Sequence, residues 1–366
     1  FKFLQKLNKA EKHKLEKRPY LLLSNHQTTL DPFNIALSFK RPIYYMASED
    51  LFTKKFTAWI IRKLVAPIPK KKSNTDLQAI RDCVKIAREG GTIGIFPEGN
   101  RTYSGQQCYI DPAIVKLVKL LKIPVILYNI TGGYGVEPRW ASNIRKGKMR
   151  GRVKEILEVD QIQKMSNDEL YDYIKASLDV VEAPSVGVYH SKKQAETLER
   201  VLFRCPKCRS NGTIYSMGKK IHCHHCDLDV TYNEHLEFTG DYEGTVNDWY
   251  KEQEEYIKNY QFTSDEQIFS DPNVRLYEVT RGVKKTLIGY GKLEMKVNQI
   301  VFSRNESSYA FLIDSISQLT IIGKHKLNFY VGEQTFQIKG EKNLNVLKYM
   351  QIFYRIKGES NELFRL

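Results

Sequence analysis

Short apolar runs alternate with amphipathic segments through the first half of the chain. Uninterrupted apolar runs indicate buried strands, whereas apolar residues at helical spacing indicate helices with one buried face. The apolar runs predict strands over residues 20–24, 41–48, 92–96, 123–130 and 149–159. The amphipathic segments predict helices over residues 31–40, 51–65, 75–91, 113–122 and 166–181. This alternation predicts an α/β domain whose mostly parallel sheet is flanked by helices.

The chain start also has apolar residues at helical spacing, set between lysines. Residues 1–17 therefore predict a basic amphipathic helix, which could cover the following domain or lie on a membrane surface. The predicted helix over 51–65, which contains Trp59 and several lysines, leaves the same two alternatives. No window carries the uninterrupted apolar length that a membrane-spanning helix needs.

The second half of the chain changes its pattern. A predicted helix over 245–260 is followed, from about residue 261, by strands with strong alternation and short turns, and a helix is expected over 343–357. This pattern predicts an antiparallel β-rich domain with a C-terminal helix. The arrangement loosely resembles a pleckstrin-homology-like domain, a likeness of fold that assigns no ligand. The strands are expected over residues 274–280, 285–291, 292–297, 299–303, 310–315, 318–323, 326–331 and 335–340.

Four of the six cysteines form two Cys-x2-Cys pairs, CPKC at 205–208 and CHHC at 223–226, around a predicted short hairpin. Four thiolates at this spacing can close a tetrahedron around zinc without an open position. The segment resembles a zinc ribbon, and the zinc is expected to be structural because so short a segment buries little apolar surface. Cys83 and Cys108 are expected to be packing residues. The predicted ligands are Cys205, Cys208, Cys223 and Cys226, with His222, His224 or His225 as alternatives for one cysteine.

Charge is distributed unevenly along the 366 residues, whose formal net charge is +15. Lys and Arg outnumber Asp and Glu 35 to 21 within residues 1–200, and the remainder is almost neutral. A positive field of this kind suits a partner that carries phosphates: nucleic acid, an anionic membrane or a phosphorylated substrate. Grouped cysteines indicate a reducing compartment, so the expected location is the cytoplasm or the cytoplasmic face of a membrane.

The stretch NHQTTLD, residues 25–31, follows the predicted strand over 20–24. A turn into the next helix can bring Asp31 back to His26, where a carboxylate would fix the imidazole tautomer and leave the second ring nitrogen as a general base. The alternative is that Asp31 only caps the helix. Ligands of parallel sheets gather at the carboxyl ends of the strands, which is where this loop lies.

The stretch FPEGNRTYSG, residues 96–105, follows another strand and should meet the first loop. Glycines allow close approach of backbone amides, and arginine matches a phosphate bidentately, so this loop suits a phosphorylated ligand. The alternative is a polar turn in which Glu98 and Arg101 pair with each other. A third segment, PIPKKKSN at 67–74, offers three consecutive lysines, one of which could face the same anion. The alternative is that these lysines form solvated surface.

The stretches NHQTTLD, PIPKKKSN, FPEGNRTYSG and KIPVILYNI are similar, in order and spacing, to the four motif blocks of the glycerolipid (lysophospholipid) acyltransferase family. That family includes the 1-acylglycerol-3-phosphate acyltransferases, and the resemblance covers roughly residues 15–180. It implies transfer of a fatty acyl group from coenzyme A or acyl carrier protein to a glycerol hydroxyl. It further implies that His26 deprotonates the hydroxyl, that Asp31 orients His26, and that Asn25, Lys72, Glu98, Gly99 and Arg101 serve the substrate site.

Two positions depart from that pattern. The second block usually carries arginine where Lys72 stands, and the third often carries threonine or serine where Asn100 stands, so acceptor identity is left open. The leading hypothesis is a membrane-associated acyltransferase acting on a lysophospholipid, with 1-acylglycerol-3-phosphate as the expected acceptor. The competing hypothesis is a non-catalytic scaffold that binds membranes or nucleic acid, although the near-neutral second half makes nucleic acid the weaker partner. The expected domains are 1–190 (acyltransferase), 191–235 (zinc ribbon), 236–260 (helical linker) and 261–366 (β-rich).

Overall fold

The computed structural model describes most of the chain, and for residues 8–10, 48, 69 and 70 it describes the backbone alone. The described ranges are 8–10, 18–48, 67–70, 77–185, 187–263, 266–280, 284–305 and 307–358. The predicted helix over 51–65 and the candidate substrate-binding residue Lys72 lie outside these ranges. The chain divides into two compact units, each considered by itself: residues 1–139 with 145–189, and residues 140–144 with 190–365.

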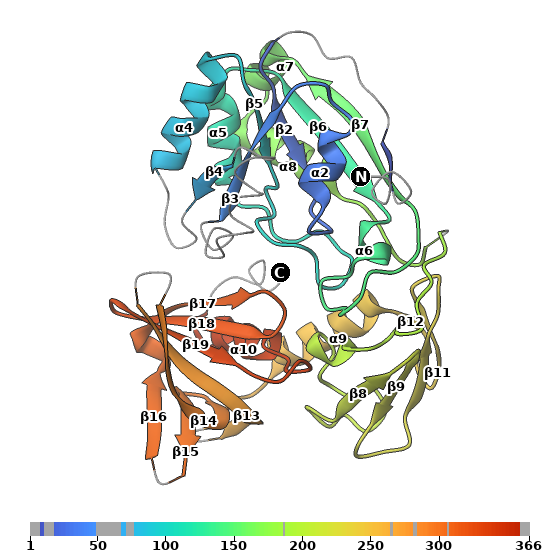
Figure 1. Cartoon of the computed structure of the whole chain (residues 1–366), viewed down its shortest axis with the longest axis vertical. Coiled ribbons are helices and arrows are strands. Elements are labelled where there is room, and N and C mark those ends of the chain that lie inside the picture. Colours follow the sequence, from blue (N-terminus) through green and yellow to red (C-terminus); the bar gives the residue numbers. More distant parts are fainter. Residues whose placement is uncertain are drawn as a thin grey trace. The chain divides into compact units, whose positions relative to one another are not determined.

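The first unit contains a seven-stranded sheet in the order β1-β7-β6-β2-β5-β3-β4 (Figure 1). Every neighbouring pair is parallel except β6 and β7. The mostly parallel sheet predicted from the alternating pattern is confirmed. The strands are β1 (Asn8–Ala10), β2 (Leu21–Ser24), β3 (Ile43–Ser48), β4 (Ile68–Lys70), β5 (Thr92–Ile95), β6 (Val125–Thr131) and β7 (Met149–Leu157).

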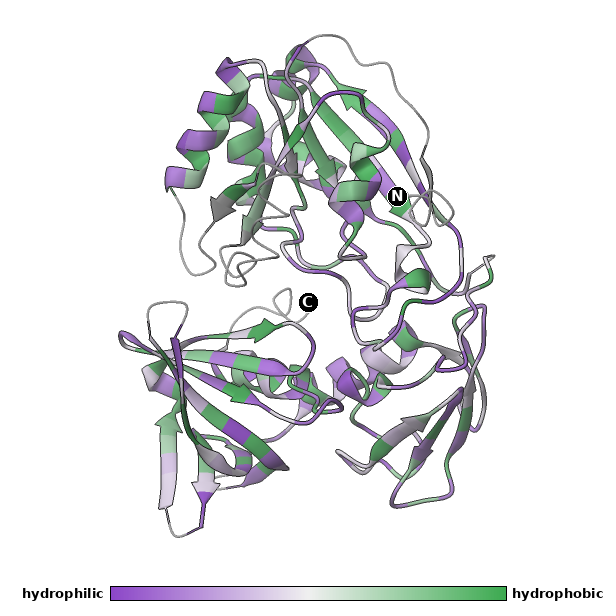
Figure 2. Ribbon diagram, in the orientation of Figure 1, coloured by the Kyte–Doolittle hydropathy of each residue, from purple (hydrophilic) through white to green (hydrophobic). Residues whose placement is uncertain are grey.

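Helices of the first unit pack on the sheet because their apolar faces match it. The core cluster joins alternate residues of β2, β5 and β6 to buried residues of α4, α5 and α8, which together cover one face. In Figure 2, α4 carries hydrophobic residues along one side and hydrophilic residues along the other. The shorter helix α2 begins with Asp31 and Pro32, the helix start that the sequence predicted. The helices are α2 (Asp31–Ala36), α4 (Leu77–Arg88), α5 (Ala113–Leu121), α6 (Gly133–Val136), α7 (Val159–Lys164) and α8 (Asn167–Leu178).

The N-terminal helix prediction is wrong where the structure tests it. Residues Asn8–Ala10 form strand β1, which pairs in parallel with Met149–Gly151 of β7. Without β1, that edge of β7 would present unpaired backbone groups, and pairing there outweighs the amphipathic pattern of a short segment. The remaining residues of the predicted helix lie outside the described ranges.

The second unit begins with a five-stranded sheet in the order β12-β11-β10-β9-β8, antiparallel throughout. β8 and β9 form the hairpin expected between the cysteine pairs. It turns at Gly218, where a positive φ of 61° favours glycine. Helix α9 (Val246–Asn259) follows, as predicted, and opens with a capping box between Thr245 and Asp248. The strands are β8 (Ile214–Met217), β9 (Lys220–Cys223), β10 (Asp229–Tyr232), β11 (Glu237–Gly240) and β12 (Gly244–Thr245).

A seven-stranded antiparallel sheet and a terminal helix complete the second unit, in the order β16-β15-β14-β13-β19-β18-β17. This confirms the antiparallel β-rich prediction; the likeness to a pleckstrin-homology-like domain stays a prediction. The elements are β13 (Gln267–Thr280), β14 (Lys284–Lys296), β15 (Gln299–Arg304), β16 (Ser307–Leu312), β17 (Ile316–Ile322), β18 (Lys326–Val331), β19 (Gln334–Lys339) and α10 (Leu347–Ile356).

The two strands predicted over 285–291 and 292–297 are one continuous strand, β14. Gly291 is the last residue of the first of these two predicted strands. In the structure, a β-carbon on Gly291 would lie 2.0 Å from the Ser303 carbonyl oxygen, so this glycine allows close approach of β15 rather than a turn. Within the described ranges, no helix has the length and apolar character needed to cross a bilayer.

Candidate active site

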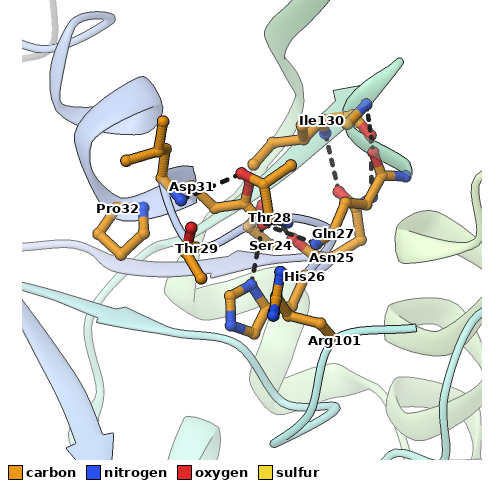
Figure 3. Close-up of polar contacts among 12 residues, drawn as sticks. Ser24, Asn25, His26, Gln27, Thr28, Thr29, Asp31, Pro32, Arg101 and Ile130 are labelled. Carbon is orange, nitrogen blue, oxygen red and sulfur yellow. Dashed lines mark hydrogen bonds and ion pairs between the residues drawn. The ribbon is translucent and has the colours of Figure 1, made fainter. Parts of the chain in front are cut away.

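The loop after β2 is organised by the carboxylate of Asp31, which is fully buried (Figure 3). Oδ2 accepts hydrogen bonds from the backbone N–H groups of Gln27 at 2.6 Å and Thr28 at 2.9 Å, and Oδ1 accepts one from the Thr28 hydroxyl at 2.5 Å. The chain is therefore folded around Asp31 as it enters α2. Because these three donors point at one side chain, position 31 requires a hydrogen-bond acceptor. These hydrogen bonds compensate the carboxylate for its loss of contact with water.

His26 completes this arrangement, with its Nδ1 atom 2.8 Å from Asp31 Oδ2. Because that carboxylate oxygen accepts its other contacts, we assign Nδ1 as the donor, which leaves Nε2 unprotonated in the neutral ring. Among the described residues, Nε2 has no hydrogen-bond partner. The imidazole stacks on Phe96 with ring centroids 4.2 Å apart, and 21% of the side chain is exposed. The ring is thus fixed on one edge and one face while remaining accessible.

Glu98 joins the two loops through backbone contacts. Its Oε1 accepts from the His26 N–H at 2.9 Å, and its Oε2 accepts from the Cys108 N–H at 2.8 Å. Burial raises the pKa of Glu98 to about 8, although both backbone hydrogen bonds act in the opposite direction. Glu98 therefore holds the backbone of residues 25–31, called the histidine loop below. It does not pair with Arg101, which was the alternative prediction for residues 96–105.

Arg101 belongs to the loop whose Thr102 N–H donates to the His26 carbonyl oxygen at 3.3 Å (Figure 3), and its Nη1 pairs with Glu137 at 3.2 Å. Burial lowers the pKa of Arg101, and the neighbouring Glu137 carboxylate opposes that shift. A second arginine, Arg139, donates from Nη1 to the Arg101 carbonyl oxygen at 3.0 Å and lies 3.9 Å from the Tyr103 ring centre. These residues place two guanidinium groups and one carboxylate beside the histidine loop.

Asn25 has its two polar groups on the backbone of β6. Its Nδ2 donates to the Ile130 carbonyl oxygen, and its Oδ1 accepts from the Ile130 N–H, both at 2.8 Å (Figure 3). Asn25 thus extends the β2–β6 pairing beyond Ser24. Gly99 adopts a positive φ of 67°, which turns the loop between Glu98 and Arg101. The substrate-site roles of Asn25, Gly99, Glu98 and Arg101 stay predictions.

Sequence reasoning missed residues on the loop that follows β6. Gln27 Oε1 accepts from Gly133 N at 2.8 Å and Tyr134 N at 3.3 Å, while both oxygens of Glu182 accept from Gly132 N at 2.9 Å. Gly132 has a positive φ of 79°. A β-carbon on Gly133 would lie 2.5 Å from Gln27 Oε1. The Gly132–Gly133 pair was the available signal, because adjacent glycines at a strand end indicate close backbone approach.

The four cysteines of the second unit meet at one place. Their sulfur atoms all lie within 4.8 Å of one another, with 3.6 Å between Cys205 and Cys226 and 3.7 Å between Cys208 and Cys223. This set could hold a metal ion. Cys83 and Cys108 are buried in the first unit, apart from this cluster. The neighbouring His225 contacts Ser210 through Nδ1 at 2.5 Å, and His224 stacks on Tyr215.

Part of the first unit is similar in sequence to known proteins. Residues 6–130 match the family model described as Acyltransferase. This region is similar in sequence to acyltransferases. The chain is 28% identical over 108 residues to the 1-acyl-sn-glycerol-3-phosphate acyltransferase of Bacillus subtilis, an alignment that covers 30% of this chain and 51% of that protein. It is also 28% identical over 120 residues to the same-named protein of Borreliella burgdorferi, covering 31% of this chain and 47% of that protein.

Among solved structures, the chain is similar to the 1-acyl-sn-glycerophosphate (LPA) acyltransferase PlsC from Thermotoga maritima. The TM-score is 0.41 and the sequence identity 21%, over 48% of this chain and 71% of that chain. The chain spans about half the length of the bacterial relatives it matches.

Proposed function

We propose that this protein transfers a fatty acyl group from a thioester donor to the hydroxyl of a lysophospholipid, with 1-acylglycerol-3-phosphate as the acceptor and phosphatidic acid as the product. The observation that carries the proposal is the buried Asp31 carboxylate 2.8 Å from Nδ1 of a partly exposed His26, with Arg101 close by. The named relatives support the acceptor class, because they are 1-acyl-sn-glycerol-3-phosphate acyltransferases.

In this reaction, Nε2 of His26 removes the proton of the acceptor hydroxyl as its oxygen attacks the thioester carbonyl carbon. The new C–O bond gives a tetrahedral oxyanion, and its collapse breaks the C–S bond. The departing thiolate takes the proton from the imidazolium, which restores His26. Asp31 supports the imidazolium while it exists, because its carboxylate already holds Nδ1–H. No covalent acyl-enzyme is required.

The phosphate of the acceptor is proposed to bind the guanidinium of Arg101. The loop of Arg101 is hydrogen-bonded to the His26 carbonyl oxygen through Thr102 N–H, and arginine donates to phosphate oxygens in a fixed fork. Lys72, which lies outside the described residues, is proposed as a further cation. We also propose that the enzyme works at the cytoplasmic face of a membrane, because its acceptor is an amphiphile and the cationic excess lies in residues 1–200.

For the second unit, we propose a structural zinc ion held by Cys205, Cys208, Cys223 and Cys226. Four thiolates within 4.8 Å of one another suit the tetrahedral Zn–S distance of roughly 2.3 Å. The purified protein should contain about one zinc per chain by elemental analysis. Cys205→Ser should lower that content and the thermal midpoint, and metal-free native protein would contradict the proposal.

Acyl transfer is tested by incubating the purified chain with acyl-coenzyme A or acyl carrier protein and lysophosphatidic acid, and following phosphatidic acid by mass spectrometry. Wild type should form product, and His26→Ala should lower kcat by about 10²–10⁴-fold while folding normally. The matched control is Lys122→Ala. Lys122 is exposed and lies outside the two candidate loops, residues 25–31 and 96–105. Absence of product with wild type across donors and acceptors would leave a membrane-binding scaffold as the better explanation.

A further inference from the structure

Glu137 connects three loops that follow three neighbouring strands. The residue itself is the C-cap of α6, the short helix that follows β6. Its carboxylate accepts from the Thr29 N–H at 3.1 Å and from the Thr29 hydroxyl at 2.8 Å, which ties it to the loop after β2. It also accepts from Arg101 Nη1 at 3.2 Å, which ties it to the loop after β5. Glu137 therefore adds to the contacts of Glu98 and Gln27 that link these loops.

Burial makes the contact with Arg101 consequential. The side chains of Arg101 and Glu137 are 12% and 11% exposed, so water screens their attraction only partly. Guanidinium has five N–H donors, and among the described residues Arg101 forms a side-chain hydrogen bond only with Glu137. Glu137 can thus fix the direction of the guanidinium while leaving most of its donors for another anion.

We propose that Glu137 is a positioning residue that aims Arg101 at the anionic headgroup of the acceptor and holds it in register with the histidine loop. This inference rests on the proposed acyl-transfer function and deepens it. It assigns recognition of a phosphate-bearing acceptor to a pair of residues rather than to Arg101 alone. Orientation matters here because arginine recognises phosphate through two parallel hydrogen bonds.

Glu137 could instead weaken binding of the acceptor. A carboxylate on Arg101 could compete with the phosphate, in which case removing the Glu137 charge would strengthen acceptor binding. The geometry favours positioning, because Glu137 makes a single contact of 3.2 Å with Arg101 and directs both oxygens to Thr29. A competitor occupying the phosphate position would be expected to engage the guanidinium through two oxygens.

The experiment compares Glu137→Gln with wild type on two acceptors: lysophosphatidic acid and the corresponding monoacylglycerol, which lacks the phosphate. Glu137→Gln should raise the KM for lysophosphatidic acid about tenfold, the loss expected for one misplaced charge-assisted contact. The KM for acyl-coenzyme A and the rate with monoacylglycerol should stay within about threefold of wild type. Glu137→Asp, which keeps the charge, should recover part of the loss, and the exposed Glu89→Gln is the matched control.

Combining Glu137→Gln with Arg101→Ala separates positioning from general structural damage. If Glu137 acts through Arg101, then adding Glu137→Gln to Arg101→Ala should cause almost no further rise in KM. An unchanged or lowered KM in Glu137→Gln overturns the inference, as does an equal loss with both acceptors. No product from wild type itself would instead refute the proposed function, so the two failures are distinguishable.

Discussion

Replacing Asp31 by asparagine tests the histidine loop most directly. The side chain keeps its size, and its remaining oxygen can take the place of Oδ2, where the Gln27 and Thr28 N–H groups and His26 Nδ1 converge. The amide nitrogen then faces the Thr28 hydroxyl, which can rotate to accept. The loop should therefore keep its shape, while the negative charge that supports protonated His26 is lost.

The two expected magnitudes differ. Hydrogen bonds to charged groups contribute about 1.5–3 kcal/mol and neutral ones about 0.5–1.5, so three weakened contacts cost roughly 3 kcal/mol. Relief from burying a carboxylate offsets part of this, which leaves a destabilisation of about 1–2 kcal/mol. Loss of the charge beside His26 should lower kcat by about 10²–10⁴-fold. Asp31→Ala, which leaves two backbone N–H groups without acceptors, should cost roughly 2–6 kcal/mol.

Acyl-transfer kinetics and urea denaturation of the two variants provide the comparison. The reasoning requires Asp31→Asn to lose far more activity than stability, and Asp31→Ala to lose both. A kcat for Asp31→Asn within tenfold of wild type would refute the orienting role. Equal stability of Asp31→Ala and wild type would refute the hydrogen-bond organisation of the loop.

Three further predictions concern stability. Burial raises the pKa of Glu98 to about 8, so the folded state holds the carboxyl proton of Glu98 more tightly than the unfolded chain does. The free energy of unfolding should therefore fall as pH rises from about 4.5 to about 8. Glu98→Gln should flatten this dependence, as measured by urea titrations at several pH values. Leu127→Ala, at a fully buried position of β6, should cost about 2–5 kcal/mol by the same method, and a cost below 1 kcal/mol would contradict its place in the core. Ser166→Ala removes the side-chain acceptor of the α8 capping box and should lower the free energy of unfolding by about 1 kcal/mol, with Ser166→Asp recovering most of it.

Helices and strands were predictable from the sequence where burial of their own apolar residues or a local cap determines their conformation. The apolar run at Leu21–Ser24 is a strand buried on both faces, and the Ser166–Glu169 pair begins α8 as expected. The prediction failed at Asn8–Ala10, where pairing with an edge strand decides the conformation, and at Gly291, where the partner strand explains the glycine. Both failures depend on neighbours distant in sequence, about which periodicity carries no information.

The candidate site was predictable to a similar extent. The approach of Asp31 to His26 depends on one tight turn, so spacing alone suggested it. The attachment of Glu98 to two backbone N–H groups was not predictable, because a buried structural carboxylate and one that contacts a substrate look alike in sequence. Glu137 was missed entirely, since its contacts with Thr29 and Arg101 span 108 and 36 residues.

The local charges also change how the cationic first half should be understood. Around His26, the guanidinium groups of Arg101 and Arg139 are opposed by the carboxylates of Glu137 and Asp31, so the local charges nearly cancel. The large excess over residues 1–200 therefore acts mainly at a distance, and salt screens exposed charges beyond about 8–10 Å. Contact between a phosphate and the partly buried Arg101 is screened much less. Attraction to an anionic surface and recognition of the acceptor headgroup should consequently have different salt dependences, because separate sets of charges are responsible for them.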